Sequence, residues 1–134
     1  MKRILNSMRF YKQIIVALAG VLLITSHMMG SNIWTEGSLR GKKVLYVYGG
    51  WEGHEPEKCR DIFVPWLKSE GAEVFLYEDL KCYDDSLLMA KVDLIVQHVT
   101  MGEISSSQEN ALLKAIKGGV GLAGWHGGLG DSFR

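Results

Sequence analysis

The stretch AGWHGGLGD, residues 123–131, places a histidine among glycines. Gly124 to Gly128 have the spacing of the G-x-S-x-G elbow, in which a strand turns sharply into a helix and holds one side chain at a sheet edge. His126 stands at the nucleophile position, where an imidazole could act as general acid or base or ligate a metal. The backbone N–H groups of Gly127 and Gly128 are predicted to be free to bind an oxyanion. The alternative is a packing turn, with His126 as a polar turn residue.

A second histidine lies in GGWEGHEPE, residues 49–57. A glycine-rich loop before a helix can bind phosphate, but the negative charges of Glu52, Glu55 and Glu57 would repel it. A dinucleotide site is therefore excluded, although Asp79 lies where an acidic residue could bind a ribose. Carboxylates with imidazole suit a cation or sugar hydroxyls. His54 and His126 are therefore predicted catalytic residues and ligands of a divalent metal, completed by Glu52 or Asp131. The alternative is that His54 and Glu55 cap the following helix.

Three further residues complete the candidate set. His98 closes an apolar run, and because neighbouring strand residues alternate faces, we expect it to be hydrogen-bonded inside a sheet. Trp51 and Trp125 could stack on sugar rings. The predicted substrate-binding residues are Trp51, Glu52, Trp125, Gly127, Gly128 and Asp131.

Alternating apolar runs and amphipathic segments predict the elements that position these residues. Strands are expected at 43–48, 72–78, 92–99 and 120–125, with a short helical turn at DDSLLMA. A helix from Pro56 should bury Cys59, Ile62, Phe63, Trp66 and Leu67, with Pro65 kinking or shortening it. A capping box at Ser105 or Ser106 starts a helix through Lys117 that buries Leu112, Leu113 and Ile116. This pattern predicts a parallel sheet covered on both faces, with His54, His98 and His126 at one edge.

The first 30 residues differ from the rest of the chain in their pattern of charged and apolar residues. Lys2, Arg3, Arg9 and Lys12 precede the apolar run 14–25, which predicts a secretory signal or N-terminal anchor over residues 1–30. A linker over 31–41 and a domain over 42–134 follow. The protein is expected to be exported, periplasmic or extracellular, touching membrane only through this segment. The remaining chain is mildly acidic, which argues against nucleic acid as a partner. Cys59 and Cys82 permit one disulfide, but a buried Cys59 thiol is favoured.

VLYVYGGWEGHEP with GVGLAGWHGGLGDSFR resembles the ThuA-like, or trehalose utilisation, family over about residues 43–134. The resemblance implies an α/β fold, a flavodoxin-like, class I glutamine amidotransferase-like three-layer parallel sheet, here the N-terminal part of the domain, truncated after about four strands. It carries over to Gly49, Gly50 and His54 in the first loop and to residues 125–128 in the elbow. His126 replaces the amidotransferase cysteine, so glutaminase activity is not expected.

The resemblance associates the chain with bacterial use of disaccharides and ketosugars. The leading hypothesis is an exported sugar-processing hydrolase, lyase or isomerase, with a small-molecule sugar as partner and acid/base or metal-assisted chemistry at His126 and His54. Two alternatives stay open: a non-catalytic carbohydrate-binding module, and an inactive fragment.

Overall fold

The computed structural model describes residues 38–134. The elements are the strands β1 (Lys43–Gly50), β2 (Glu73–Tyr77), β3 (Leu94–Thr100) and β4 (Gly121–Gly124), the helices α2 (Pro56–Ser69), α3 (Ser86–Met89) and α4 (Ser106–Lys117), the 3₁₀ helices η1 (Glu52–His54) and η2 (Leu80–Asp84), and the π-helical turn η3 (His126–Gly130). The predicted signal or anchor and most of the predicted linker lie outside the described residues. No helix within residues 38–134 is long and apolar enough to span a membrane.

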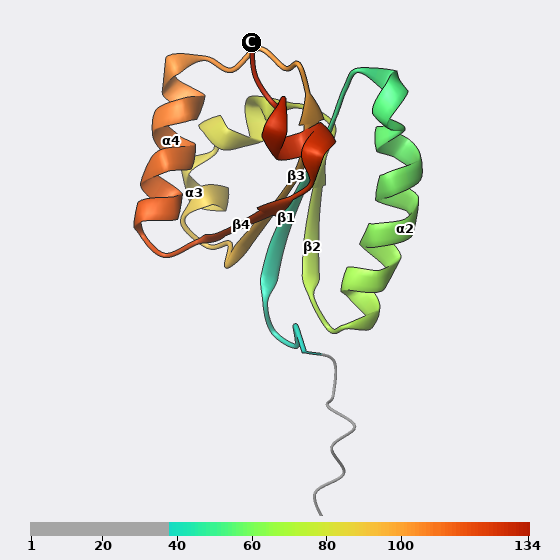
Figure 1. Ribbon diagram of the computed structural model, residues 1–134. Helices are drawn as coiled ribbons and strands as arrows, with labels where there is room; N and C mark the ends of the chain where they lie inside the picture. Colours follow the sequence, from blue (N-terminus) through green and yellow to red (C-terminus); the bar gives the residue numbers. More distant parts are fainter. Residues whose placement is uncertain (1–37) are drawn as a thin grey trace, which may run out of the picture. The chain divides into compact units, whose positions relative to one another are not determined.

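The four strands form one parallel sheet in the order β2-β1-β3-β4. The chain moves from β1 outward to β2 and then returns to the other side of β1 for β3 and β4. Figure 1 shows the consequence: α2 covers one face of the sheet, whereas α3 and α4 cover the other. This reversal creates a switch point at the carboxyl ends of β1 and β3, where ligands of open α/β sheets bind. The predicted three-layer flavodoxin-like architecture is confirmed.

Alternating side chains of β1 and β3 supply two separate cores. Leu45, Val47, Ile95 and Val99 face the α3–α4 layer, where Tyr83, Leu88 and Leu112 join them. Val44, Tyr46, Tyr48 and Val96 face α2, where Val64 and Leu67 join them. Both faces of the central strands are therefore apolar, which explains why their sequences read as continuous apolar runs.

Helix α4 begins as predicted. Ser105 is its N-cap, and the Ser105 hydroxyl and the Gln108 side chain bond each other's backbone N–H groups in a capping box. Leu112 is buried and Ile116 is partly buried, but Leu113 is exposed. The prediction for Leu113 is wrong because the contact with the sheet is narrower than the apolar stripe of the sequence.

The predicted buried face of α2 is partly wrong. Ile62 and Trp66 are exposed, while the buried side chains are Pro56, Val64 and Leu67. The side of α2 that contacts the sheet includes Arg60. The Arg60 guanidinium carbon lies 5.0 Å from the centre of the Tyr48 ring, and the guanidinium donates a hydrogen bond to the Tyr48 hydroxyl at 3.0 Å. Arg60, which is not part of the predicted apolar face, therefore packs on the sheet through its planar cation.

Pro65 does not end α2, which continues to Ser69. Proline removes one helical N–H donor, so the carbonyl of Asp61 loses its usual partner. Both residues lie on the solvent-exposed side of the helix, where water can hydrate the freed carbonyl. The cost of the proline is small at this position.

Two smaller features concern the start of the described chain and the two cysteines. The described part of the predicted linker, residues 38–41, forms a turn in which Leu39 N–H donates to the Glu70 carbonyl at 3.1 Å and Gly41 N–H to Gly71 at 3.3 Å. These residues therefore pack with the domain. Cys59 and Cys82 are free thiols, Cys59 half-buried and Cys82 buried. Burial raises the pKa of the Cys82 thiol to about 12, so it remains protonated at neutral pH.

Candidate functional site

His54 ends the short helix η1, directly after β1. The next residue, Glu55, adopts a left-handed conformation with φ of 51° and begins α2 without a side-chain cap. The His54 side chain turns away from the helix end, and its Nδ1 atom lies 2.9 Å from the hydroxyl of Thr100 at the end of β3. Glu55 is therefore the N-cap residue of α2, in line with the alternative that the loop caps the helix, but its side chain makes no capping hydrogen bond and pairs with Lys58 instead.

The elbow after β4 forms the π-helical turn η3, with Trp125 as its N-cap. The Trp125 carbonyl accepts the N–H groups of Gly128 and Leu129, both at 2.8 Å. The prediction that Gly128 N–H is free for an oxyanion is wrong, because the turn closes on its own backbone.

The elbow backbone lies so close to its neighbours that positions 127 and 128 have no room for a side chain. A Cβ atom at position 128 would lie 2.2 Å from the Gln97 carbonyl oxygen. One at position 127 would lie 2.5 Å from the His54 Nδ1 atom. Any side chain at position 127 would therefore displace His54. The elbow backbone thus packs directly against the loop that follows β1.

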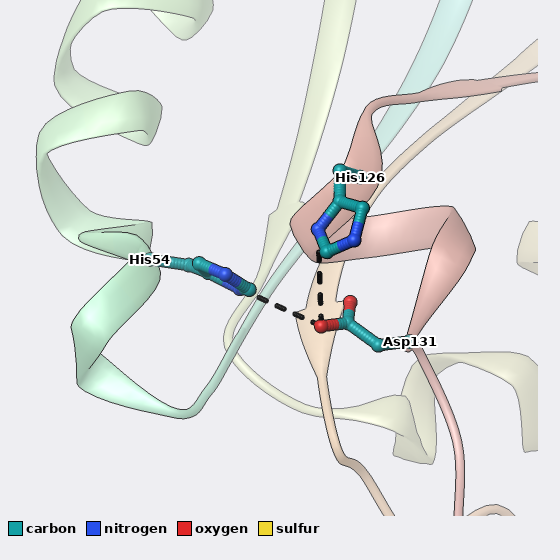
Figure 2. A group of neighbouring side chains, drawn as sticks. All are labelled: His54, His126 and Asp131. Atoms are coloured by element: carbon teal, nitrogen blue, oxygen red, sulfur yellow. Dashed lines mark ion pairs between the residues drawn. The ribbon is translucent and has the colours of Figure 1, made fainter.

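His54, His126 and Asp131 come together at the carboxyl edge of the sheet (Figure 2). One potential ligand atom from each residue lies within 4.8 Å of the others. The Asp131 Oδ2 atom is 4.0 Å from Nδ1 of His54 and 4.0 Å from Nδ1 of His126. The His126 side chain is 83% exposed, whereas those of His54 and Asp131 are 26% and 27% exposed. The cluster has a solvent-facing side and a protein-facing side.

Backbone pairing with the segment after β3 holds Asp131 in place. Met101 N–H donates to the Asp131 carbonyl at 2.8 Å, and Gly102 N–H donates to the Ser132 carbonyl at 2.7 Å. Met101 has a left-handed backbone, with φ of 54°. The Asp131 Oδ1 atom is buried and has no hydrogen-bond partner among the described residues. An unpaired buried carboxylate oxygen is costly, which makes this position suited to a bound cation.

A scan of protein-family models matches residues 43–134 to ThuA, described as trehalose utilisation. The chain belongs to the ThuA family. Searches of curated proteins and of solved structures found no match. The family resemblance predicted from the sequence is confirmed, and it links this chain to trehalose utilisation.

Two buried polar residues of β3 support the site of this ThuA chain, and the sequence analysis missed them as site residues. The Gln97 amide accepts the Tyr83 hydroxyl at 2.6 Å and donates to the Gly128 carbonyl at 2.9 Å and to the Ser132 hydroxyl at 3.0 Å. The Thr100 hydroxyl donates to the Gly127 carbonyl. The available signal was the presence of polar side chains at the end of an otherwise apolar strand.

His98 differs from its predicted environment in the ThuA domain. It is buried, 1% exposed, but neither ring nitrogen has a hydrogen-bond partner among residues 38–134. Its ring lies 4.6 Å from that of Trp125, centre to centre. Burial, and then the positive charge of protonated His54, lower the pKa of His98, opposed by Asp131 and Glu57. His98 is thus a core residue behind the cluster.

The remaining predicted site residues occupy different environments. Trp51 is 53% exposed, and its ring meets that of His54 edge-on, with centres 4.8 Å apart. Trp125 stacks on Phe63 at 4.7 Å and packs into the core beneath α2, so this face of its indole is covered. Glu52 is exposed and does not belong to the three-residue cluster found among the described residues. Asp131, rather than Glu52, supplies the carboxylate.

Proposed function

We propose that this ThuA chain is a carbohydrate-processing enzyme whose catalytic centre, His54, His126 and Asp131, binds a divalent metal ion. The observation that carries the proposal is the convergence of two imidazoles and one carboxylate from separate loops at the switch point of the sheet. Two histidines with one carboxylate is a ligand set of catalytic zinc and iron sites, which keep further coordination positions open.

The distances favour a metal over direct hydrogen bonds. The two 4.0 Å separations between Asp131 Oδ2 and the histidine Nδ1 atoms exceed the range of hydrogen bonds. Two ligands at ~2.1 Å from one ion lie at most ~4.2 Å apart. A ring nitrogen of each histidine and an Asp131 oxygen lie within 4.8 Å of one another. Small side-chain shifts would therefore bring one ligand atom from each residue to a single ion, whose charge would compensate the buried Asp131 Oδ1 atom.

The residues around the cluster suit a sugar. A bound divalent ion would polarise a carbonyl or hydroxyl oxygen of the substrate and lower the pKa of a coordinated water. His126, which is far more exposed than His54, would hold the ion on the side that is open to the substrate. The exposed Trp51 ring beside His54 offers an apolar surface for a pyranose. The trehalose link of the family supports a disaccharide or its ketosugar as substrate, in a hydrolase, lyase or isomerase reaction.

A second candidate function uses the same surface without catalysis. The exposure of Trp51 beside the cluster supports a carbohydrate-binding module. In that case disaccharide binding measured by calorimetry would be lost in Trp51→Ala, and no metal or pH would yield product.

The proposal also includes the location. The basic residues and apolar run of residues 1–30 support export, with cleavage or N-terminal anchoring. N-terminal mass analysis of the protein from cell fractions tests it, and an intact N-terminus in the cytoplasmic fraction would refute export.

Metal analysis and turnover by the full chain test the catalytic proposal. We expect about one Zn²⁺ or Mn²⁺ per chain and metal-dependent conversion of trehalose or an oxidised trehalose. His126→Ala should weaken metal binding at least ~10-fold and abolish turnover while the circular dichroism spectrum is retained, because one of three ligands is lost.

Glu109→Gln on the exposed surface of α4 serves as the matched control and should behave like the wild type. Equal metal affinity in His126→Ala and the wild type would refute the metal centre. Unchanged turnover in His126→Ala would refute the catalytic assignment.

A further inference from the structure

The hydroxyl of Thr100 lies between the two loops that form the site. Thr100 is the last residue of β3 and is buried, 1% exposed. Its Oγ1 atom lies 2.9 Å from His54 Nδ1 in the loop after β1, and it donates to the Gly127 carbonyl in the elbow after β4. One side chain therefore bridges both loops at the end of the central strand.

The number of protons on this bridge fixes their positions. A threonine hydroxyl has one proton, and a carbonyl oxygen can only accept a hydrogen bond. The Thr100 proton is therefore directed to Gly127, and Oγ1 is left as an acceptor toward His54. The contact at Nδ1 is a hydrogen bond only if that nitrogen carries the proton. The nearby Asp131 carboxylate, 4.0 Å from the same Nδ1 atom, favours a proton there as well.

We propose that Thr100 is a positioning residue that holds neutral His54 in the Nδ1–H tautomer and so makes Nε2 the nitrogen available to a metal ion or a substrate proton. The consequence for the metal rests on the proposed function; the tautomer does not. In metal sites, the hydrogen bond at one ring nitrogen sets which nitrogen is the ligand, and losing such a partner typically costs 10–100-fold in affinity.

The packing around the bridge supports this role. The Gly127 backbone lies against the His54 ring so closely that a Cβ atom would be 2.5 Å from Nδ1. The Thr100 carbonyl accepts the Trp51 N–H at 3.2 Å, which anchors the start of the loop that carries His54. The ring is thus confined between Thr100, Gly127 and Trp51, and the hydrogen bond decides its protonation pattern.

Nitrogen-15 NMR of the histidine rings in the metal-free full chain tests the tautomer directly. His54→Gln identifies the His54 signals. When the His54 ring is neutral, wild type and Thr100→Ser should show protonated Nδ1 and unprotonated Nε2 at His54. Thr100→Val, which keeps the shape but lacks the hydroxyl, should show a reduced Nδ1–H population.

The same three proteins are then titrated with zinc. We expect Thr100→Val to bind zinc 10–100-fold more weakly than the wild type, and Thr100→Ser to retain most of the affinity. A wild-type His54 with its proton on Nε2, or a Thr100→Val tautomer identical to that of the wild type, would overturn the inference.

If Thr100→Val and the wild type bind zinc with equal affinity, the proposed role of Thr100 in metal binding is overturned. If the wild type binds no zinc, the proposed metal function fails, while the NMR result still decides the tautomer. If Thr100→Val does not fold, Thr100→Ala is measured against Thr100→Ser in the same way, with the same outcomes.

Discussion

At the scale of single residues, the site combines exposed reactive groups with buried polar groups that lack partners. His126 faces solvent, whereas the Asp131 Oδ1 atom and both ring nitrogens of His98 are buried without hydrogen bonds among the described residues. Buried unpaired polar atoms reduce stability. Besides the Tyr46 hydroxyl in the middle of β1, those of the described residues belong to Asp131 and His98, in the cluster and directly behind it. This placement is typical of a functional site that stability alone would not select.

The environment of His98 predicts how stability depends on pH. Burial lowers the pKa of folded His98 below its value in the unfolded chain, ~6.5. Above that pH both states are neutral and His98 has no effect. As the pH falls below it, the unfolded state binds the proton first, so the free energy of unfolding decreases until the pH reaches the folded pKa.

Urea unfolding in the presence of a chelator at pH 7.5, 6.5 and 5.5 measures this loss. His98→Gln, which cannot titrate, should show a smaller decrease over the same range. An equal decrease in the two proteins would contradict the prediction.

At the scale of elements, β3 organises the site. Near its carboxyl end, the Gln97 side chain donates a hydrogen bond to the Gly128 carbonyl, and the Thr100 hydroxyl donates one to the Gly127 carbonyl. The elbow is therefore fastened to the central strand at two successive peptide groups. Helix α4 has a comparable buried amide, Gln108, but that side chain closes a capping box and donates to Asp84 at 2.8 Å.

These two glutamines predict different effects of the same substitution. Gln97→Leu leaves the Tyr83 hydroxyl and the Gly128 carbonyl without this partner, so it should lower the free energy of unfolding by about 2–4 kcal/mol. It should also weaken metal binding, since η3 loses its anchor. Gln108→Leu should cost about 1 kcal/mol through loss of the cap and leave metal affinity unchanged.

Urea unfolding and zinc titration of both variants test this prediction. Equal metal affinities in Gln97→Leu and Gln108→Leu would show that the Gln97 network does not position the elbow.

At the scale of the whole described domain, the site depends on two loops that are far apart in sequence. The loop after β1 and the turn after β4 meet because β1 and β4 both flank β3 in one parallel sheet. A ligand that joins His54 to His126 and Asp131 therefore crosslinks the first and last strands. Such a ligand binds the folded chain much more tightly than the unfolded one, and it stabilises the domain by mass action.

Thermal unfolding should show this coupling. Zinc at about 100 times its dissociation constant should raise the free energy of unfolding by about 2.7 kcal/mol, which corresponds to a melting temperature ~10 °C higher. Asp131→Asn should largely remove the shift. A melting temperature that does not respond to zinc, or responds equally in Asp131→Asn, would contradict the crosslink.

Much of this protein could be predicted from its sequence. Apolar runs alternating with amphipathic segments determined the parallel α/β sheet, because strands buried on both faces leave that pattern. The glycine-flanked motifs located His54 and His126, since the carboxyl ends of parallel strands share one edge. The family followed from the same two motifs, and the match over residues 43–134 confirmed it.

Only the tertiary structure decided which side chains meet. It selected Asp131 over Glu52, turned α2 so that Arg60 rather than Ile62 packs on the sheet, and used the Gly128 N–H to close its own turn. It also assigned Thr100 and Gln97 to the site. Periodicity in a sequence reports burial, whereas hydrogen bonds between loops depend on distances that arise after the strands have assembled.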